Sequence, residues 1–184
     1  MTFRFNEAKA TQAAACLLRL RGGRMKYLKL IKLLYIADRE ALSRWGRPIT
    51  TDRYVSMKEG PVLSNTYNLI HSEPSPFEQS IWHRHIRTVG DWDVALVGDV
   101  PKDELSQVEE ELLAEVFRVH GQKNRWNLVS ETHKFPEWED PGTGSLPITY
   151  REILKALNKS EEEISETLQQ MKSMIACEQV LQPL

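Results

Sequence analysis

Histidine side chains are the first candidates for chemistry in this sequence. His83 and His85 stand two residues apart in a segment expected to be a strand, so both rings would leave one face and could bind a metal ion. No carboxylate or thiol stands beside them at a diagnostic ligand spacing, so we expect exposed histidines and no metal site. His133 ends an expected helix, where a cation stabilises the last carbonyl groups, and a catalytic role would need a second reactive group within reach.

The paired carboxylates are explained by helix ends rather than by acid–base chemistry. Residues 109–111 and 161–163 are all glutamate and stand in the first turns of expected helices, where the helix dipole favours negative charge. The sequence contains no glycine-rich phosphate loop, no C-x-x-C, no H-E-x-x-H and no G-x-S-x-G. We therefore expect that the protein is not an enzyme and has no cofactor, and that Cys16 and Cys177 are buried, reduced thiols.

The charges are unevenly distributed although the net charge is only −2. Residues 19–47 carry a local charge of +7, and residues 99–140 carry a local charge of −6. One interpretation is that the two regions neutralise each other in the fold. The other is that residues 19–47 form a basic face for an acidic protein or a nucleic acid, although they show no helix-turn-helix signature and no interleaved aromatic residues.

The 184 residues are enough to bury a hydrophobic core, and we expect a single domain over residues 1–184. The pattern predicts a mainly α fold with a small β-hairpin, arranged as a compact helical bundle around a central buried helix. That helix covers residues 25–44, where apolar side chains occur on almost every side. Lys26, Lys29 and Lys32 follow at helical spacing and predict its one exposed stripe.

Start and stop signals place the other elements. Asn6 predicts the N-cap of a helix, and Pro61 predicts the first turn of another, which Pro74-Ser75-Pro76 would end. Gly90-Asp91 divides a β-hairpin expected within residues 80–98. The remaining expectations are helices at 7–20, 105–121, 124–133 and 149–157, a last helix after Ser160, and a loop at 135–147.

Location signals are absent from the sequence. No apolar run approaches the length that a membrane-spanning helix needs, and the first residues lack the apolar segment of a secretory signal. We therefore expect a cytoplasmic protein that does not bind a membrane.

Four short motifs follow one another between residues 28 and 138. They are L-K-L-I-K-L-L-Y-I-A at 28–37, W-G-R-P-I at 45–49, Y-V-S-M-K-E-G-P-V at 54–62 with Tyr67 just after, and S-E-T-H at 130–133 followed by Trp138. This order resembles the Panacea domain, also called the SocA-like antitoxin domain, whose members share a K-L-x-K-L-L-Y helix, a G-x-P turn, a K-x-G-P-V element and an S-x-x-T-H … W segment. Glu59 departs from the pattern, since the family often has an aromatic residue there, and the expected hairpin has no counterpart in it.

The resemblance implies an antitoxin of a bacterial or phage toxin–antitoxin system. Family antitoxins bind a cognate protein toxin, usually encoded by the adjacent gene, and some are thought to deliver it to a protease. Aromatic and basic side chains are the usual anchors of protein interfaces, so we expect the toxin to contact residues in or beside the motifs. These residues are Trp45, Arg47, Tyr54, Lys58 and Tyr67.

Two alternatives stay open from the sequence alone. The aromatic residues of that set could instead pack over the central helix as part of the core. The protein could also be a nucleic-acid-binding or regulatory protein that uses the basic region 19–47, although we expect nucleic acid to be the less favoured partner.

Overall fold

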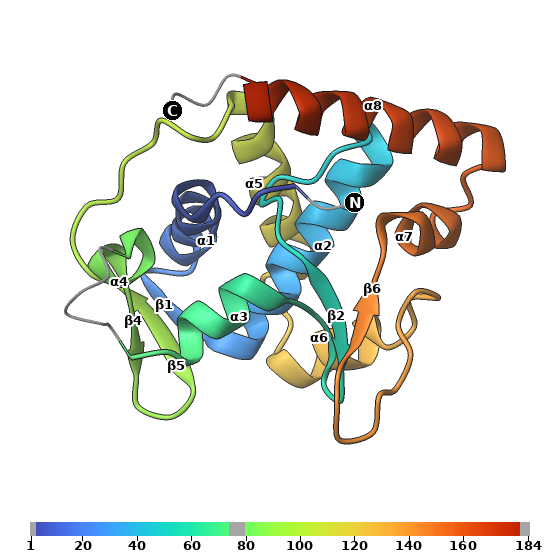
Figure 1. The fold of residues 1–184 in the computed structure, drawn as a ribbon. Helices are drawn as coiled ribbons and strands as arrows, with labels where there is room; N and C mark the ends of the chain where they lie inside the picture. Colours follow the sequence, from blue (N-terminus) through green and yellow to red (C-terminus); the bar gives the residue numbers. More distant parts are fainter. Residues whose placement is uncertain (1–2, 74–79, 181–184) are drawn as a thin grey trace.

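Helix α2 (Tyr27–Trp45) is the centre of the computed structural model of this protein, which describes residues 3–73 and 80–180 (Figure 1). Every residue from Leu28 to Asp38 is buried, as expected for a helix that is apolar on nearly all sides. Gly46 ends the helix in the left-handed conformation. The helices that contact α2 are α1 (Glu7–Leu20), α3 (Ser64–His71), α5 (Gln107–His120), α6 (Arg125–Thr132) and α7 (Tyr150–Ala156).

Two three-stranded antiparallel sheets complete the described part of the fold. The first has the order β1-β5-β4, and the second has the order β3-β2-β6. The hairpin expected within residues 80–98 is confirmed as the β4–β5 pair, with Gly90 in its turn at a φ of 60°. The strands are β1 (Arg24–Lys26), β2 (Tyr54–Met57), β3 (Gly60–Leu63), β4 (Ile86–Val89), β5 (Asp93–Leu96) and β6 (Leu146–Ile148).

Helix ends agree well with the sequence signals. The Asn6 side chain accepts a hydrogen bond from the Lys9 amide and begins α1, as expected. Ser160 and Glu163 exchange the two hydrogen bonds of a capping box at the start of α8 (Glu161–Val180), the helix that crosses the top of the molecule in Figure 1. Apolar side chains from these elements form a hydrophobic cluster that reaches from Phe3 to Met171.

Several expectations about local structure are wrong. Pro61 lies in strand β3 and not in a helix, because it pairs with Ser56 across the β2–β3 hairpin. His83 and His85 lie in a short helix, α4 (Ile81–His85), so they do not share a strand face. Part of the expected loop 135–147 is strand β6, which the long-range pairing with β2 creates. The expected stop at residues 74–76 lies outside the described residues.

The burial of several charged and thiol side chains also differs from expectation. Lys29 and Lys32 do not belong to an exposed stripe, because they are 6% and 0% exposed and donate hydrogen bonds to backbone carbonyl groups. Glu109 is buried rather than solvated, since Lys9 and Arg47 both contact its carboxylate. Both cysteines are free as expected, but Cys16 is half-buried and Cys177 is exposed.

The basic and acidic regions of the sequence neutralise each other in part. Within the described residues, three arginines of the segment 19–47 form ion pairs with glutamates of the segment 99–140. The pairs are Arg39–Glu137 at 2.7 Å, Arg44–Glu115 at 2.8 Å and Arg47–Glu109 at 3.2 Å. This confirms the first interpretation of the charge asymmetry for the C-terminal half of α2.

The helices of residues 3–73 and 80–180 include none with the length and apolar character needed to cross a lipid bilayer.

Two tryptophans offer a direct test of the core. Trp82 is 1% exposed and Trp92 is 53% exposed, so Trp82→Ala should lower the free energy of unfolding by about 3–5 kcal/mol and Trp92→Ala by less than about 1 kcal/mol. Urea denaturation of both variants followed by circular dichroism measures the difference. Equal losses would contradict the placement of Trp82 in the core.

Candidate binding site

Three of the four sequence motifs meet at the turn between β2 and β3. We call residues 57–61 the motif turn. The first motif contributes Lys32 from the buried length of α2, the third contributes the turn itself, and the fourth contributes Thr132, His133 and Trp138 from the end of α6 and the loop after it. Residues that are far apart in the sequence therefore support one short surface element.

Lys32 binds the motif turn from its buried side. Its Nζ donates a hydrogen bond to the Pro61 carbonyl at 2.7 Å, and the side chain is fully buried. Burial lowers the pKa of Lys32 to about 7, and the charge of Glu59 opposes the shift. A buried ammonium that lost its carbonyl partner would cost free energy. The contact therefore favours the one arrangement in which β3 packs against α2.

Gly60 is required by both its backbone and its neighbours. Its φ is +95°, a region that other residues rarely adopt. A Cβ at this position would lie 2.8 Å from Thr132 Oγ1, 3.0 Å from Lys32 Nζ and 3.2 Å from His133 Cδ2. The glycine lets the motif turn approach the end of α6 closely.

His133 packs under the motif turn and does not serve as a cationic helix end. Its ring stacks on Trp138 with centroids 3.9 Å apart and planes 9° from parallel, and Trp138 Nε1 donates to the Met57 carbonyl at 3.1 Å. Burial lowers the pKa of His133 and the Lys32 ammonium lowers it further, while a hydrogen bond with the Lys58 backbone opposes them. Among the described residues, no hydrogen-bond partner reaches its buried Nε2.

The buried contacts leave Lys58 as the exposed side chain of the motif turn, with Glu59 half-buried beside it. Burial raises the pKa of Tyr27 at the start of α2, Tyr67 and Glu59 raise it further, and Arg125 opposes the rise. The motif turn thus presents a charged tip whose backbone is fixed by Lys32, Gly60 and the His133–Trp138 stack.

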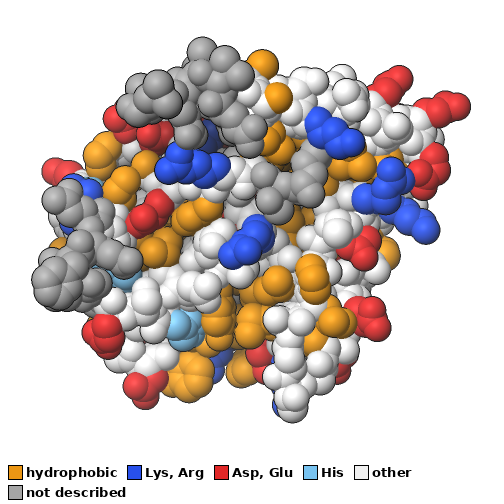
Figure 2. Space-filling view, viewed as in Figure 1, with side chains coloured by type: hydrophobic (Ala, Val, Ile, Leu, Met, Phe, Trp, Pro, Cys, Tyr) orange, Lys and Arg blue, Asp and Glu red, His pale blue; other side chains and the backbone are white. Residues whose placement is uncertain are grey.

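An aromatic surface adjoins this tip. We call Tyr27, Tyr67, His71 and Trp92 the aromatic face; they come from the start of α2, from α3 and from the β4–β5 turn region. Tyr67 lies 4.1 Å from His71 and Tyr27 lies 4.8 Å from His71, measured between ring centroids. Tyr27 and Trp92 are nearly parallel, with centroids 6.3 Å apart. Figure 2 shows hydrophobic side chains and a histidine gathered along the lower edge of the same view.

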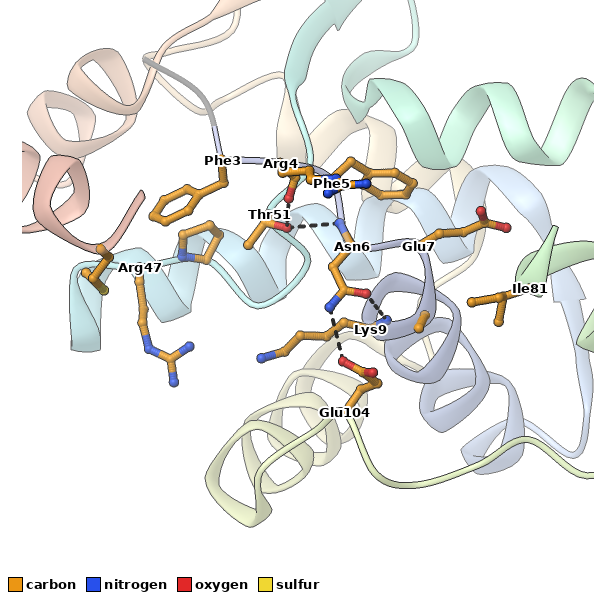
Figure 3. Close-up of a pocket in the computed structure, with 13 residues that line it drawn as sticks. Phe3, Arg4, Phe5, Asn6, Glu7, Lys9, Arg47, Thr51, Ile81 and Glu104 are labelled. Carbon is orange, nitrogen blue, oxygen red and sulfur yellow. Dashed lines mark hydrogen bonds between the residues drawn. The ribbon is translucent and has the colours of Figure 1, made fainter. Parts of the chain in front are cut away.

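The five residues expected to contact a partner do not form one patch. Lys58 and Tyr67 lie at the end of the molecule just described. Trp45 is the last residue of α2, so the 1.5 Å rise per residue separates its backbone from that of Tyr27 by about 27 Å. Arg47 follows it and lines a pocket of about 680 Å³ with the N-terminal segment (Figure 3).

Tyr54 belongs to the core. It is 3% exposed, and its hydroxyl donates to Asp38 Oδ2 at 2.9 Å. Burial raises the pKa of Asp38 to about 6, and hydrogen bonds from Thr50, Tyr54 and Ile49 limit the rise. The alternative in which aromatic residues pack over the central helix is therefore confirmed for Tyr54, whose partner Asp38 also binds Ile49 and Thr50 of the segment before β2.

The exposed aromatic residues Trp92 and Trp126 were missed at the sequence level. They are 53% and 52% exposed, and the Arg125 guanidinium lies over both rings, 5.6 Å and 4.9 Å from their centroids. A sequence signal existed for Trp92, because a tryptophan beside a Gly-Asp turn has little core to enter. Trp126 stands in the first turn of α6, and its neighbours in the sequence give no helical pattern that predicts its exposure.

The described ranges hold no cluster of metal-binding side chains. No three histidine, cysteine, aspartate or glutamate side chains within them lie close enough together to hold a metal ion.

Comparison with known families accounts for the convergence of motifs. The family model described as antitoxin SocA-like, Panacea domain, matches residues 30–139. The match covers more than half of the 184 residues, and the chain belongs to this family. It includes Lys32, the motif turn, His133 and Trp138, so the resemblance expected from these motifs is confirmed. No curated protein and no solved structure matches the chain.

Gly60 can be tested against a glycine with the same sign of φ and open surroundings. Gly98 has a φ of +73°, and a Cβ added to it would meet no atom within 4 Å, so Gly98→Ala should cost about 1–2 kcal/mol of stability from backbone strain alone. Gly60→Ala should cost at least about 1 kcal/mol more, because the new methyl group overpacks against Thr132 and Lys32. Chemical denaturation of the two variants measures both values, and equal costs would argue against the close approach.

Lys32 predicts a specific pH dependence of stability. Its folded pKa of about 7 lies below the ordinary value of 10.5, so between these values the unfolded chain binds more protons and stability rises with pH. From pH 7 to pH 9 the gain should be about 2 kcal/mol. Lys32→Met should flatten this rise, measured as the difference between the denaturation curves of the variant and the unmodified protein. An unchanged slope in Lys32→Met would assign the pH dependence to another group.

Proposed function

We propose that this protein is an antitoxin that neutralises a protein toxin by binding it directly. The observation that carries the proposal is that the family match includes the residues that support the motif turn. Most of these residues are buried and have structural roles. The exposed end of the motif turn at Lys58, which they position, is therefore the part that a partner can contact. We take the toxin to be the product of the adjacent gene and the pair to act in the cytoplasm.

The contact surface in this proposal combines the motif turn with the aromatic face. Lys58 supplies an exposed cation, and Trp92 supplies a large ring of which about half is accessible. Tyr67 is half-buried and packs against Tyr27 and His71 in the aromatic face. Tryptophan, tyrosine and charged side chains around a rigid backbone are typical of interface hot spots.

The charges favour a protein partner over nucleic acid bound along residues 19–47. Lys32 is buried, and Arg39, Arg44 and Arg47 form ion pairs with glutamates, so residues 32–47 do not extend the positive charge of residues 19–29 into a continuous cationic face. Trp45 and Arg47 lie at the far end of α2 and form a separate second region of the proposed surface.

Co-expression tests the proposal. We expect the adjacent gene product to arrest bacterial growth when expressed alone, and co-expression of this protein to restore growth and to co-purify with it. Immunoblots of the toxin separate inhibition by binding, in which toxin persists, from delivery to a protease, in which toxin disappears. A harmless neighbour that never co-purifies would overturn the antitoxin proposal.

Variants then locate the surface. Lys58→Glu and Trp92→Ala should weaken toxin binding about tenfold or more in a titration, because both remove exposed anchors. Lys155→Glu, an exposed change on α7, is the matched control and should leave affinity unchanged. Trp45→Ala and Arg47→Glu report on the other end of α2. Full affinity in both Lys58→Glu and Trp92→Ala would move the contact away from the motif turn.

A further inference from the structure

A basic hollow lies beside the aromatic face, between β1 and the start of α6. Its volume is about 550 Å³, within the range of roughly 300–1,000 Å³ that is usual for small-ligand sites. Five cationic side chains and one carboxylate line it. The cations are Arg21, Arg24, Lys26, Lys29 and Arg125.

The single carboxylate of the basic hollow is already occupied. Asp93 forms ion pairs with Arg24 at 2.6 Å and with Lys26 at 3.1 Å. Within the described part of the chain, Arg21, Lys29 and Arg125 form no ion pair with a carboxylate. This differs from the C-terminal half of α2, where arginines are neutralised by glutamates.

Lys29 is a nearly buried cation in the wall of this positively charged hollow, where its charge is unfavourable. Its side chain is 6% exposed at the wall of the basic hollow, and its Nζ donates to the Gly121 carbonyl at 2.5 Å. Burial lowers the pKa of Lys29, and repulsion from Arg21 lowers it further. An anionic ligand in the hollow would stabilise the charged forms of Lys29 and Arg21, because it would supply the negative charge that no carboxylate provides there.

One wall of the basic hollow is a flat aromatic ring. Trp126 is about half exposed, and the Arg125 guanidinium lies 4.9 Å from its ring centroid. Stacking on tryptophan and arginine planes is how proteins bind nucleobases without reading their sequence. The hollow therefore combines cations suited to phosphate with a surface suited to a base.

We propose that the basic hollow binds a nucleotide, with its phosphates against Arg21 and Lys29 and its base against Trp126. Four of the five cations precede residue 30, where the family match begins, whereas Arg125 and Trp126 lie within the matched residues. The proposal does not depend on the antitoxin function. The same chemistry is offered by a free nucleoside triphosphate and by the 5′-phosphorylated end of a single strand.

Isothermal titration calorimetry on the full chain tests the proposal with ATP, GTP, inorganic phosphate and a 5′-phosphorylated hexathymidylate. We expect at least one nucleotide probe to bind more tightly than inorganic phosphate, with an affinity that falls as salt increases. Binding of ATP or GTP identifies a free nucleotide as the ligand, and binding of the oligonucleotide alone identifies the end of a strand. No binding of any nucleotide probe at 1 mM, about the weakest affinity worth assigning, would overturn the proposal.

Matched variants assign the binding to the hollow. Arg21→Ala and Trp126→Ala change exposed side chains and should each weaken nucleotide binding about tenfold, since a charged hydrogen bond and a base stack are lost. Trp126→Phe should retain most of the affinity because it keeps an aromatic ring. Arg87→Ala, an exposed arginine on β4, is the control and should bind as the unmodified protein does. Equal affinity in Arg21→Ala, Trp126→Ala and Arg87→Ala would place the ligand elsewhere and overturn the assignment.

Discussion

The hydrogen bond from Lys32 to the Pro61 carbonyl is the contact on which the arrangement of the motif turn depends. A fully buried ammonium is tolerated because a backbone oxygen accepts a hydrogen bond from it. This contact sets the distance between α2 and β3. Gly60 and the His133–Trp138 stack pack beside this contact. The shape of the motif turn therefore depends on residues from α2, the β2–β3 hairpin and the end of α6 together.

Family membership and physical structure meet at the same residues. The motifs that identify a Panacea domain are mostly positioning residues, and their side chains face inward. The motifs therefore identify the residues that support the motif turn, and not the exposed side chains that a partner would contact. The aromatic face and Lys58 are the exposed counterparts, and they lie together because the start of α2, α3 and two hairpins end on the same side of the molecule (Figure 1).

The sequence predicted helices and caps well and strands poorly. Asn6, Ser160 and the apolar run in α2 act locally, so periodicity and capping signals were sufficient. Strands β1 and β6 are only three residues long and exist through pairing with distant segments, which no local pattern encodes. Strand β3 pairs with the adjacent β2, and it was missed because Pro61 was interpreted as the start of a helix. The exposure of Lys32 was predicted wrongly because helical spacing suggested a solvent-facing side chain, whereas the carbonyl that accepts its hydrogen bond lies 29 residues further along the chain. The expected partner residues divided accordingly, with Lys58 and Tyr67 near the motif turn, Tyr54 in the core and Trp45 at the opposite end.

The separation between inward-facing support and outward-facing contact at the motif turn has an evolutionary consequence. Lys58 and Trp92 can change type without disturbing the Lys32 contact or the backbone of Gly60, because neither takes part in them. A lineage of such proteins could therefore acquire a new partner through a few surface substitutions while keeping the same folding stability. Substitutions would then accumulate faster at the exposed side chains of the motif turn than at the buried residues that support it. Sequence divergence among relatives should be concentrated on those exposed side chains.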